Sequence, residues 1–186
     1  VASDQGWLQP GTWPQLEHAD PFPAGGVVAI ENSVDESRYF GLRAVPLPDG
    51  RTCLTVAFVC DTYAQMLEAA KPYLQHPGTT FAVTPSIDLH WPVEYERRKT
   101  VVGYGEIVKW TDPVRQLIRQ GMVLHDGSTM LAEHIQRAVA VRSQNSIALS
   151  SQRSPGPIEL ARCAVWATAL ASKPKAAGKP VLVIAS

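Results

Sequence analysis

The sequence lacks several features that would assign it quickly to a class of protein. It has no run of 18 or more apolar residues, so nothing in it predicts a membrane-spanning helix. Its three cysteines show no CxxC spacing, and we interpret them as buried free thiols in a reducing compartment. It has no excess of positive charge, because 17 basic residues balance 17 acidic ones. This balance disfavours a free-standing nucleic-acid-binding protein but is compatible with an enzyme whose grip on nucleic acid comes partly from another domain.

Short motifs of the common catalytic sites are also missing. There is no Walker A pattern, so this stretch carries no ATPase motor of its own. The GxSxG, HExxH and GxGxxG patterns are absent as well, which leaves a constellation of acidic residues as the catalytic candidate. The sequence starts with valine and shows no leader peptide pattern, so we expect it to be a piece of a longer protein.

The composition that is present fits one globular α/β domain. A chain of 186 residues with 45% hydrophobic and 18% charged residues can bury a single core. We expect a Pro- and Gly-rich lead-in over residues 1–26, a folded domain over 27–172 and a tail over 173–186. The lead-in either lays its tryptophans on the domain or serves as a linker. The tail, with Val181–Ile184, is either an unstructured end or a docked edge strand.

The stretch 27–42 is the centre of the predicted fold. Four apolar residues, 27–30, lead directly into Glu31, a pattern typical of a buried strand that ends in a carboxylate at the edge of a sheet. A polar turn follows, and a second strand is predicted over 39–46. After a turn at Pro48-Asp49-Gly50, a third strand is predicted over 52–60, so the three strands form an antiparallel meander.

The rest of the chain is predicted to alternate helices with short strands. Asp61 is expected to cap a helix over 63–74, whose apolar residues recur at helical spacing. Thr111 is expected to cap a second helix, which ends at Gly121. The other expected elements are a strand at 80–84, a charged surface helix at 92–101, a strand at 105–110, an extended run at 122–124, a helix at 131–139, a strand at 147–149 and an Ala-rich helix whose first turn holds Pro157.

This order of elements is that of the RNase H-like fold, an α/β fold with a central mixed sheet and helices on both faces. Three local motifs narrow the resemblance: Pro10-Gly11-Thr12-Trp13, the run Arg119–Gly127 that ends in His-Asp-Gly, and the helix Ile158–Ala167. Over about residues 8–172 the sequence resembles the C-terminal nuclease domain of the terminase large subunit of tailed bacteriophages, in the type found in phages and prophages of actinobacteria.

The resemblance implies a role in packaging phage DNA in the cytoplasm of the bacterial host. In that family an ATPase domain of the same chain drives translocation, the small terminase subunit and the portal are partners, and the C-terminal domain cuts concatemeric double-stranded DNA. Cutting uses two Mg²⁺ or Mn²⁺ ions held about 3.5–4 Å apart by acidic residues. Those residues end the first strand, end the fourth strand and open the last helix.

Carrying these positions over gives Glu31, Asp88 and Glu159 as the expected catalytic and metal-binding residues. Glu31 ends the first strand, where the family has aspartate. The fourth-strand position falls on Thr84, so Asp88 is the nearest acid, and the last position falls near Gly156, so Glu159 is the nearest acid. The alternative roles are a turn cap for Asp88 and a partner of the helix dipole for Glu159.

Further candidates are weaker. Asp35, His125 and Asp126 lie near predicted strand ends, and Asp126 reads best as a turn residue. His125 and His134 lack the i, i+4 spacing of a helical metal pair, so we expect structural or surface roles for both. Expected DNA-binding residues, unless they are solvated surface charge, are Arg97, Arg98, Lys99 and Arg153.

Two rival hypotheses remain at this stage. A degenerate, catalytically inactive domain would keep the fold without the metal and serve as a DNA-docking or protein-contact module. An unrelated domain would merely share the order of elements. An active site requires the three carboxylates to lie within about 5–8 Å of one another, close enough to share two metal ions.

Overall fold

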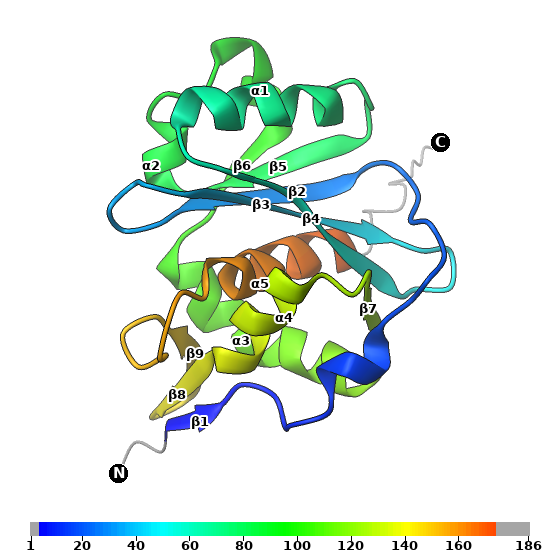
Figure 1. Ribbon diagram of the computed structural model, residues 1–186, viewed down its shortest axis with the longest axis vertical. Coiled ribbons are helices and arrows are strands. Elements are labelled where there is room, and N and C mark those ends of the chain that lie inside the picture. The colour runs from blue at the N-terminus through cyan, green and yellow to red at the C-terminus, as the bar shows by residue number, and fades with distance from the viewer. Residues whose placement is uncertain (1–3, 174–186) are drawn as a thin grey trace, which may run out of the picture.

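A computed structural model describes residues 4–173. Its centre is a six-stranded mixed sheet in the order β6-β5-β2-β3-β4-β7, which lies between two layers of helices (Figure 1). The antiparallel part is the meander β2–β3–β4. The other pairings are parallel: β5 pairs with β2, β6 with β5, and β7 with β4. The strands are β2 (Gly26–Asn32), β3 (Tyr39–Pro46), β4 (Thr52–Cys60), β5 (Thr79–Val83), β6 (Lys99–Val101) and β7 (Val123–His125).

The meander confirms the sequence prediction almost residue for residue. Strands β3 and β4 have the predicted bounds, and β2 extends the predicted strand by one residue at each end. The turn between β3 and β4 is tight because Gly50 adopts a φ of 92°, a conformation that glycine accepts without steric cost. Apolar runs and turn chemistry are local signals, and here they agree with the tertiary structure.

Helices cover the two faces of this sheet unequally. On one face, α1 (Tyr63–Leu74) and α2 (Pro85–Asp88) pack over the smaller of the two main apolar clusters, which includes Met66 and Ile87. On the other face, α5 (Glu159–Ser172) lies against β2 and β3, and α3 (Tyr104–Arg119) and α4 (Thr129–Arg137) pack on α5 (Figure 1). Residues of α5 from Leu160 to Ala169 are almost all buried, so this helix forms the middle of the larger core.

A second, three-stranded sheet lies on the far side of α3. Its order is β1-β8-β9, formed by β1 (Asp4–Gly6), β8 (Val139–Ser143) and β9 (Ser146–Ser150), and both pairings are antiparallel. The lead-in runs from β1 through a 3₁₀ helix, Trp13–Leu16, to the main sheet. Trp7 and Trp13 are both buried in the core, so the lead-in does lay aromatics on the domain.

The structure corrects two sequence predictions in the region of α3. Residues 105–110 are not a strand, because α3 runs unbroken from Tyr104 to Arg119 and buries Ile107, Val114 and Ile118. Thr111 is no cap. It lies inside that helix, where its hydroxyl donates to the Ile107 carbonyl at 2.6 Å.

The charged segment 92–101 is no α-helix either. It forms a 3₁₀ helix, Val93–Arg98, and then the edge strand β6. The cap of α1 is Thr62 rather than Asp61, since the Thr62 hydroxyl accepts from the Gln65 backbone N–H.

The later part of the chain is close to prediction with shifted bounds. Helix α4 ends at Arg137, and Val139 already belongs to β8, a strand that the sequence reasoning missed. Pro157 precedes α5 instead of lying in its first turn. The expected segment Val181–Ile184 lies outside the described residues. Within residues 4–173, no helix is both long and apolar enough to cross a bilayer.

Candidate functional site

Glu31 lies at the carboxyl end of β2, on the face of the sheet that α5 covers. Successive side chains of a strand point to opposite faces, so Glu31 shares the face of Ala29, which belongs to the α5 core. Ile30, between them, belongs to the cluster under α1. The period of two therefore directs a carboxylate toward the start of a buried helix.

Arg162, in the first turns of α5, binds this carboxylate. Its Nε donates to both Glu31 oxygens, Oε1 and Oε2, at 3.0 Å each. The two side chains are 17% and 12% exposed, so water screens the pair little. The Arg162 guanidinium also lies over the Trp166 ring, 5.2 Å from its centre. The arginine is thus held from two sides, by a charge and by an aromatic face.

The ionisation of Glu31 is strongly perturbed. Burial is the largest cause and raises its pKa from 4.5 to about 7, against the opposing effect of Arg162. The negative charge of the nearby Glu159 is a smaller contribution to the same rise. Glu159 is the first residue of α5, and its buried Oε1 has no hydrogen-bond partner among residues 4–173. Glu31 and Glu159, two of the three predicted site residues, are therefore close enough to interact.

The second predicted position holds no acid. Ile30 pairs with Val83 in the parallel register of β2 and β5, so Thr84 comes next beside Glu31. The buried Thr84 hydroxyl makes no hydrogen bond within the part of the chain that the structure describes. At the third position, Gly156 lies two residues before Ile158, the N-cap of α5, and contributes no side chain. Of the two other positions at which the family has metal-binding acids, one therefore provides only the hydroxyl of Thr84, and the other, Gly156, provides no side chain.

Asp88 is not brought to Glu31. It ends α2, which belongs to the layer of α1, and its carboxylate forms an ion pair with Lys99. Lys99 is also bound by Glu96 at 2.7 Å. The side chain of Asp88 is thereby committed to the edge strand β6 rather than to the face that Glu31 shares with α5.

The remaining candidates take mostly structural positions. Arg98 donates to the backbone carbonyls of Leu74, His76 and Thr79, and so ties the end of α1 to β5. Arg97 is exposed, and Arg153 lines a cavity beside Arg162. Asp35 accepts hydrogen bonds from Ser33 and Ser37 inside its own turn, and those bonds lower its pKa.

The two histidines are buried and structural. His125 stacks on Trp13 with ring centres 4.4 Å apart, and its Nε2 donates to the Trp13 carbonyl. His134 accepts the Leu160 backbone N–H at Nδ1, at the start of α5. Burial, together with the positive charges of Arg137 and Arg38, lowers the pKa of His134 from 6.5 to about 4.

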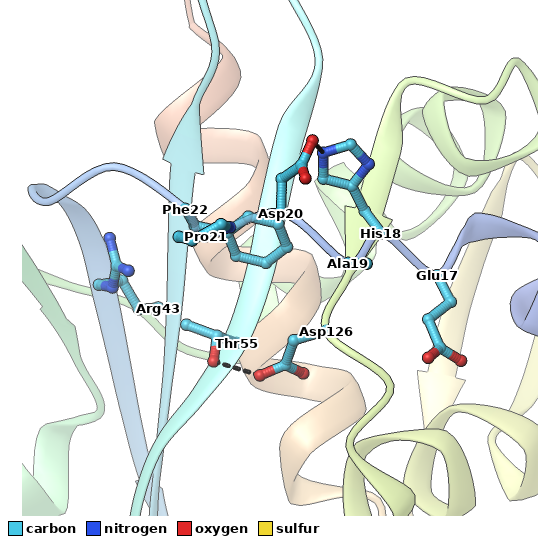
Figure 2. A pocket seen from close by; sticks show the side chains of 9 residues that line it. All are labelled: Glu17, His18, Ala19, Asp20, Pro21, Phe22, Arg43, Thr55 and Asp126. Carbon is cyan, nitrogen blue, oxygen red and sulfur yellow. Dashed lines mark hydrogen bonds and ion pairs between the residues drawn. The ribbon is translucent and has the colours of Figure 1, made fainter.

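A separate hollow of about 310 Å³ is lined by residues 17–22 of the lead-in, Arg43 of β3, Thr55 of β4 and Asp126 (Figure 2). It contains Asp126, whose carboxylate accepts from the Thr55 hydroxyl at 2.6 Å and from the Ser128 backbone N–H. Asp126 is thus the turn residue that the sequence predicted. In the lining of the same hollow, His18 Nε2 lies 3.6 Å from an Asp20 carboxylate oxygen.

The donor set does not fit a two-metal centre. Such a centre needs several carboxylates converging on shared ions. Among residues 4–173, no group of three or more His, Cys, Asp or Glu side chains could hold a metal ion. Glu31 already has the Arg162 guanidinium as its cation, and of the two other predicted acids Glu159 is the one that interacts with it.

Sequence reasoning missed Arg162, although the signal was present. It is the one charged side chain in an otherwise apolar and small-residue stretch, Leu160–Ala171. Arginine is rarely buried without a partner, so an arginine on such a helix predicts a buried acid opposite it. The pairing joins residues 131 positions apart, and only the tertiary fold identifies the partner.

The arrangement of these elements is an RNase H-like nuclease fold, as the sequence predicted. No family profile matches the chain, and no curated protein sequence matches it. Solved structures do. The large terminase of bacteriophage HK97 aligns with 92% of this chain at a TM-score of 0.64 and 13% identity. This chain spans 44% of the length of that HK97 protein.

A second terminase shows the same fold. The large terminase nuclease of the thermophilic phage G20c aligns with 82% of this chain and 85% of its own length, at a TM-score of 0.60 and 9% identity. A structure of that nuclease with bound magnesium aligns at a TM-score of 0.58 and 9% identity, over 82% of this chain and 84% of its own length. The fold of this chain is therefore that of phage large-terminase nuclease domains. The actinobacterial type stays a prediction.

Proposed function

We propose that this chain is the nuclease-fold domain of a phage terminase large subunit, and that it contacts DNA during packaging without cutting it. Two independent lines support the first half of the proposal. The sequence resembles terminase nuclease domains in its motifs and order of elements, and the fold matches solved large terminases of HK97 and G20c. In this role its partners are double-stranded DNA, the ATPase domain of the same longer chain, the small terminase subunit and the portal, in the host cytoplasm.

The second half is carried by the Glu31–Arg162 ion pair. A bound Mg²⁺ or Mn²⁺ would supply the activated water and the charge stabilisation that phosphodiester hydrolysis needs. Here the Arg162 guanidinium provides the positive charge beside Glu31, at 3.0 Å from both oxygens. A divalent ion would have to displace a buried, stacked arginine. Thr84 and Gly156 offer it no carboxylate, so Glu159 would be the one predicted acid near Glu31 to share the ion, where a two-metal centre needs at least three. The degenerate domain is the hypothesis that this geometry favours.

The test is cleavage of supercoiled plasmid DNA with Mn²⁺, with Mg²⁺ and with EDTA. We expect the plasmid to remain supercoiled in all three conditions, and a terminase nuclease domain with an intact acidic set serves as the positive control. The matched variant is Glu31→Ala. Metal-dependent cutting by the wild-type chain that Glu31→Ala abolishes would refute the proposal and establish an active nuclease anchored on Glu31.

Metal binding gives a second readout that does not depend on activity. Free Mn²⁺ has a strong paramagnetic resonance signal that disappears on binding, so its titration with the protein counts bound ions. We expect no loss of signal at micromolar Mn²⁺, and no difference between the wild type and Glu31→Ala. Stoichiometric binding that the variant loses would mean that Arg162 yields to the metal.

A further inference from the structure

A cavity of about 490 Å³ lies beside the ion pair and opens to solvent. Four parts of the chain form it: Tyr104 at the start of α3, Val141 of β8, the end of β9 with the following turn, and Arg162 of α5. We propose that this cavity is where the domain binds a phosphodiester segment of DNA. The inference rests on the proposed function and names the surface through which the domain contacts DNA.

The lining of the cavity has the chemistry of an anion site. It contains two arginines, Arg153 and Arg162, together with the hydroxyls of Ser150 and Ser151, and among residues 4–173 no carboxylate lines it. Arginine presents a planar fork of donors that matches the oxygens of a phosphate. The adjacent acid, Glu31, lies behind Arg162 and already has that arginine as its partner.

Arg162 is oriented to offer donors to this cavity. It binds Glu31 through Nε alone, and within the described part of the chain neither of its Nη nitrogens makes a hydrogen bond. The Trp166 ring stacks on the guanidinium, and its Nε1 donates to the Gly103 carbonyl at 3.2 Å. One indole therefore fixes both the arginine and the backbone that carries Tyr104. A preorganised donor loses little side-chain entropy when a ligand binds.

Tyr104 makes nucleic acid a better fit than a small anion. Its side chain is 63% exposed, although it is among the large apolar residues that folding normally covers. An exposed aromatic next to arginines can pack on a sugar or a base while the guanidinium groups bind the backbone. A free phosphate would use the arginines and leave the tyrosine without a role.

The test measures binding of a labelled 20-base-pair duplex by fluorescence anisotropy, with EDTA present and at two salt concentrations. Tyr104→Ala and Arg153→Gln should each weaken binding about fivefold or more, and Arg153→Gln should also reduce the salt dependence. At pH 8, where Glu31 with its pKa of about 7 is mostly ionised, Glu31→Gln should strengthen binding, because it removes the negative charge behind Arg162. A variant that simply unfolds would not bind more tightly, so this rise separates a binding effect from a folding defect.

The matched control is Arg119→Gln. It removes one positive charge from the exposed far end of α3, about 22 Å from Tyr104 along the helix. It should bind the duplex as the wild type does. If Tyr104→Ala and Arg153→Gln also bind like the wild type, the cavity is not the DNA site, although the proposed function stands. If the wild-type chain does not bind the duplex at low salt, the DNA-contacting function itself fails.

Inorganic phosphate identifies the source of the anion. At equal ionic strength, phosphate should displace the duplex no better than chloride does, because it lacks the contact with Tyr104 and the neighbouring phosphates. Displacement of the duplex by millimolar phosphate, beyond the effect of chloride, would overturn the assignment to DNA and identify a site for a free anion.

Discussion

Replacing Glu31 by glutamine should change how the stability of the domain depends on pH. The unfolding free energy of Glu31→Gln, measured relative to that of the wild type, should be higher at alkaline pH than at acid pH. The pKa of Glu31 rises from 4.5 to about 7 on folding, chiefly through burial. One pKa unit is worth about 1.4 kcal/mol, so ionising this carboxyl costs about 3 kcal/mol more in the folded protein than in the unfolded chain. Glutamine resembles the neutral acid in shape and cannot ionise.

The sign of the effect follows from proton linkage. The folded protein holds the Glu31 proton more tightly, so this carboxyl contributes its full stability below pH 4.5 and loses it as the pH rises to about 7. The unfolding free energy of Glu31→Gln minus that of the wild type should therefore increase by about 3 kcal/mol between pH 4.5 and pH 8. Urea denaturation followed by tryptophan fluorescence at both pH values measures it.

The difference between variant and wild type is needed because His134 has the opposite pH dependence. Its pKa falls from 6.5 to about 4, so it loses stability as the pH falls over nearly the same range in which Glu31 gains it. The wild-type curve alone would mix the two. Glu94→Gln, which removes an exposed carboxyl, is the matched control and should follow the wild type at each pH.

Two outcomes would refute the reasoning. An unchanged difference between pH 4.5 and pH 8 would mean that Arg162 fully offsets the cost of burying the carboxylate. A difference that decreases with pH would mean that the ion pair stabilises the fold on balance and that the pKa of Glu31 is lowered. Both outcomes are physically possible for a buried ion pair, because attraction and desolvation are large and opposed.

The remaining predictions concern stability. His134→Ala should lower the unfolding free energy at pH 7. At pH 4 the difference from the wild type should be smaller by about 3 kcal/mol, because the wild type loses stability on acidification through the lowered pKa of His134 and the variant does not. Equal differences at the two pH values in urea denaturation would contradict this. Gly41→Ala should cost about 1–3 kcal/mol in thermal denaturation, because its Cβ would lie 2.4 Å from the Phe58 ring, and Phe58→Leu should relieve part of that cost. Thr62→Ala should lower the unfolding free energy by about 1 kcal/mol, whereas Asp61→Ala should change it little, because Thr62 caps α1. A larger effect of Asp61→Ala than of Thr62→Ala would mean that Asp61 is the capping residue.

Local signals predicted the parts of the fold that depend on local chemistry. The meander emerged from apolar runs and a Pro-Asp-Gly turn, and the face of α1 from helical spacing of its apolar residues. The start of α3 was missed because Thr111 looks like a cap and Pro113 follows it. In the structure both lie inside the helix, where the packing of Ile107 and Val114 outweighs the weaker preferences of single residues.

The candidate site was predictable only in part, for a similar reason. Glu31 was predicted from its place at the end of a buried strand, and Glu159 from its place near the start of the last helix; the structure brings the two close enough to interact, and their role in a site stays a prediction. The partner of Glu31 could not be read from spacing, because Arg162 meets it through the packing of α5 on β2. Asp88 was predicted to turn toward the face of the sheet that carries Glu31. Its separation of four residues from Thr84 does not show that the short helix α2 packs in the layer of α1, on the other face.

The pairing of β1 with β8 has a practical consequence for anyone who divides this chain into fragments. Gln5 pairs with Ala140, and the two tryptophans that follow fill the core beneath α3 and α4. A fragment that began at β2 would leave one long edge of β8 without its partner strand, with a hydrophobic cleft beside it. Unpaired edges of this kind recruit strands from other molecules. Such a fragment would be expected to aggregate, and its insolubility would say nothing about the nuclease fold itself.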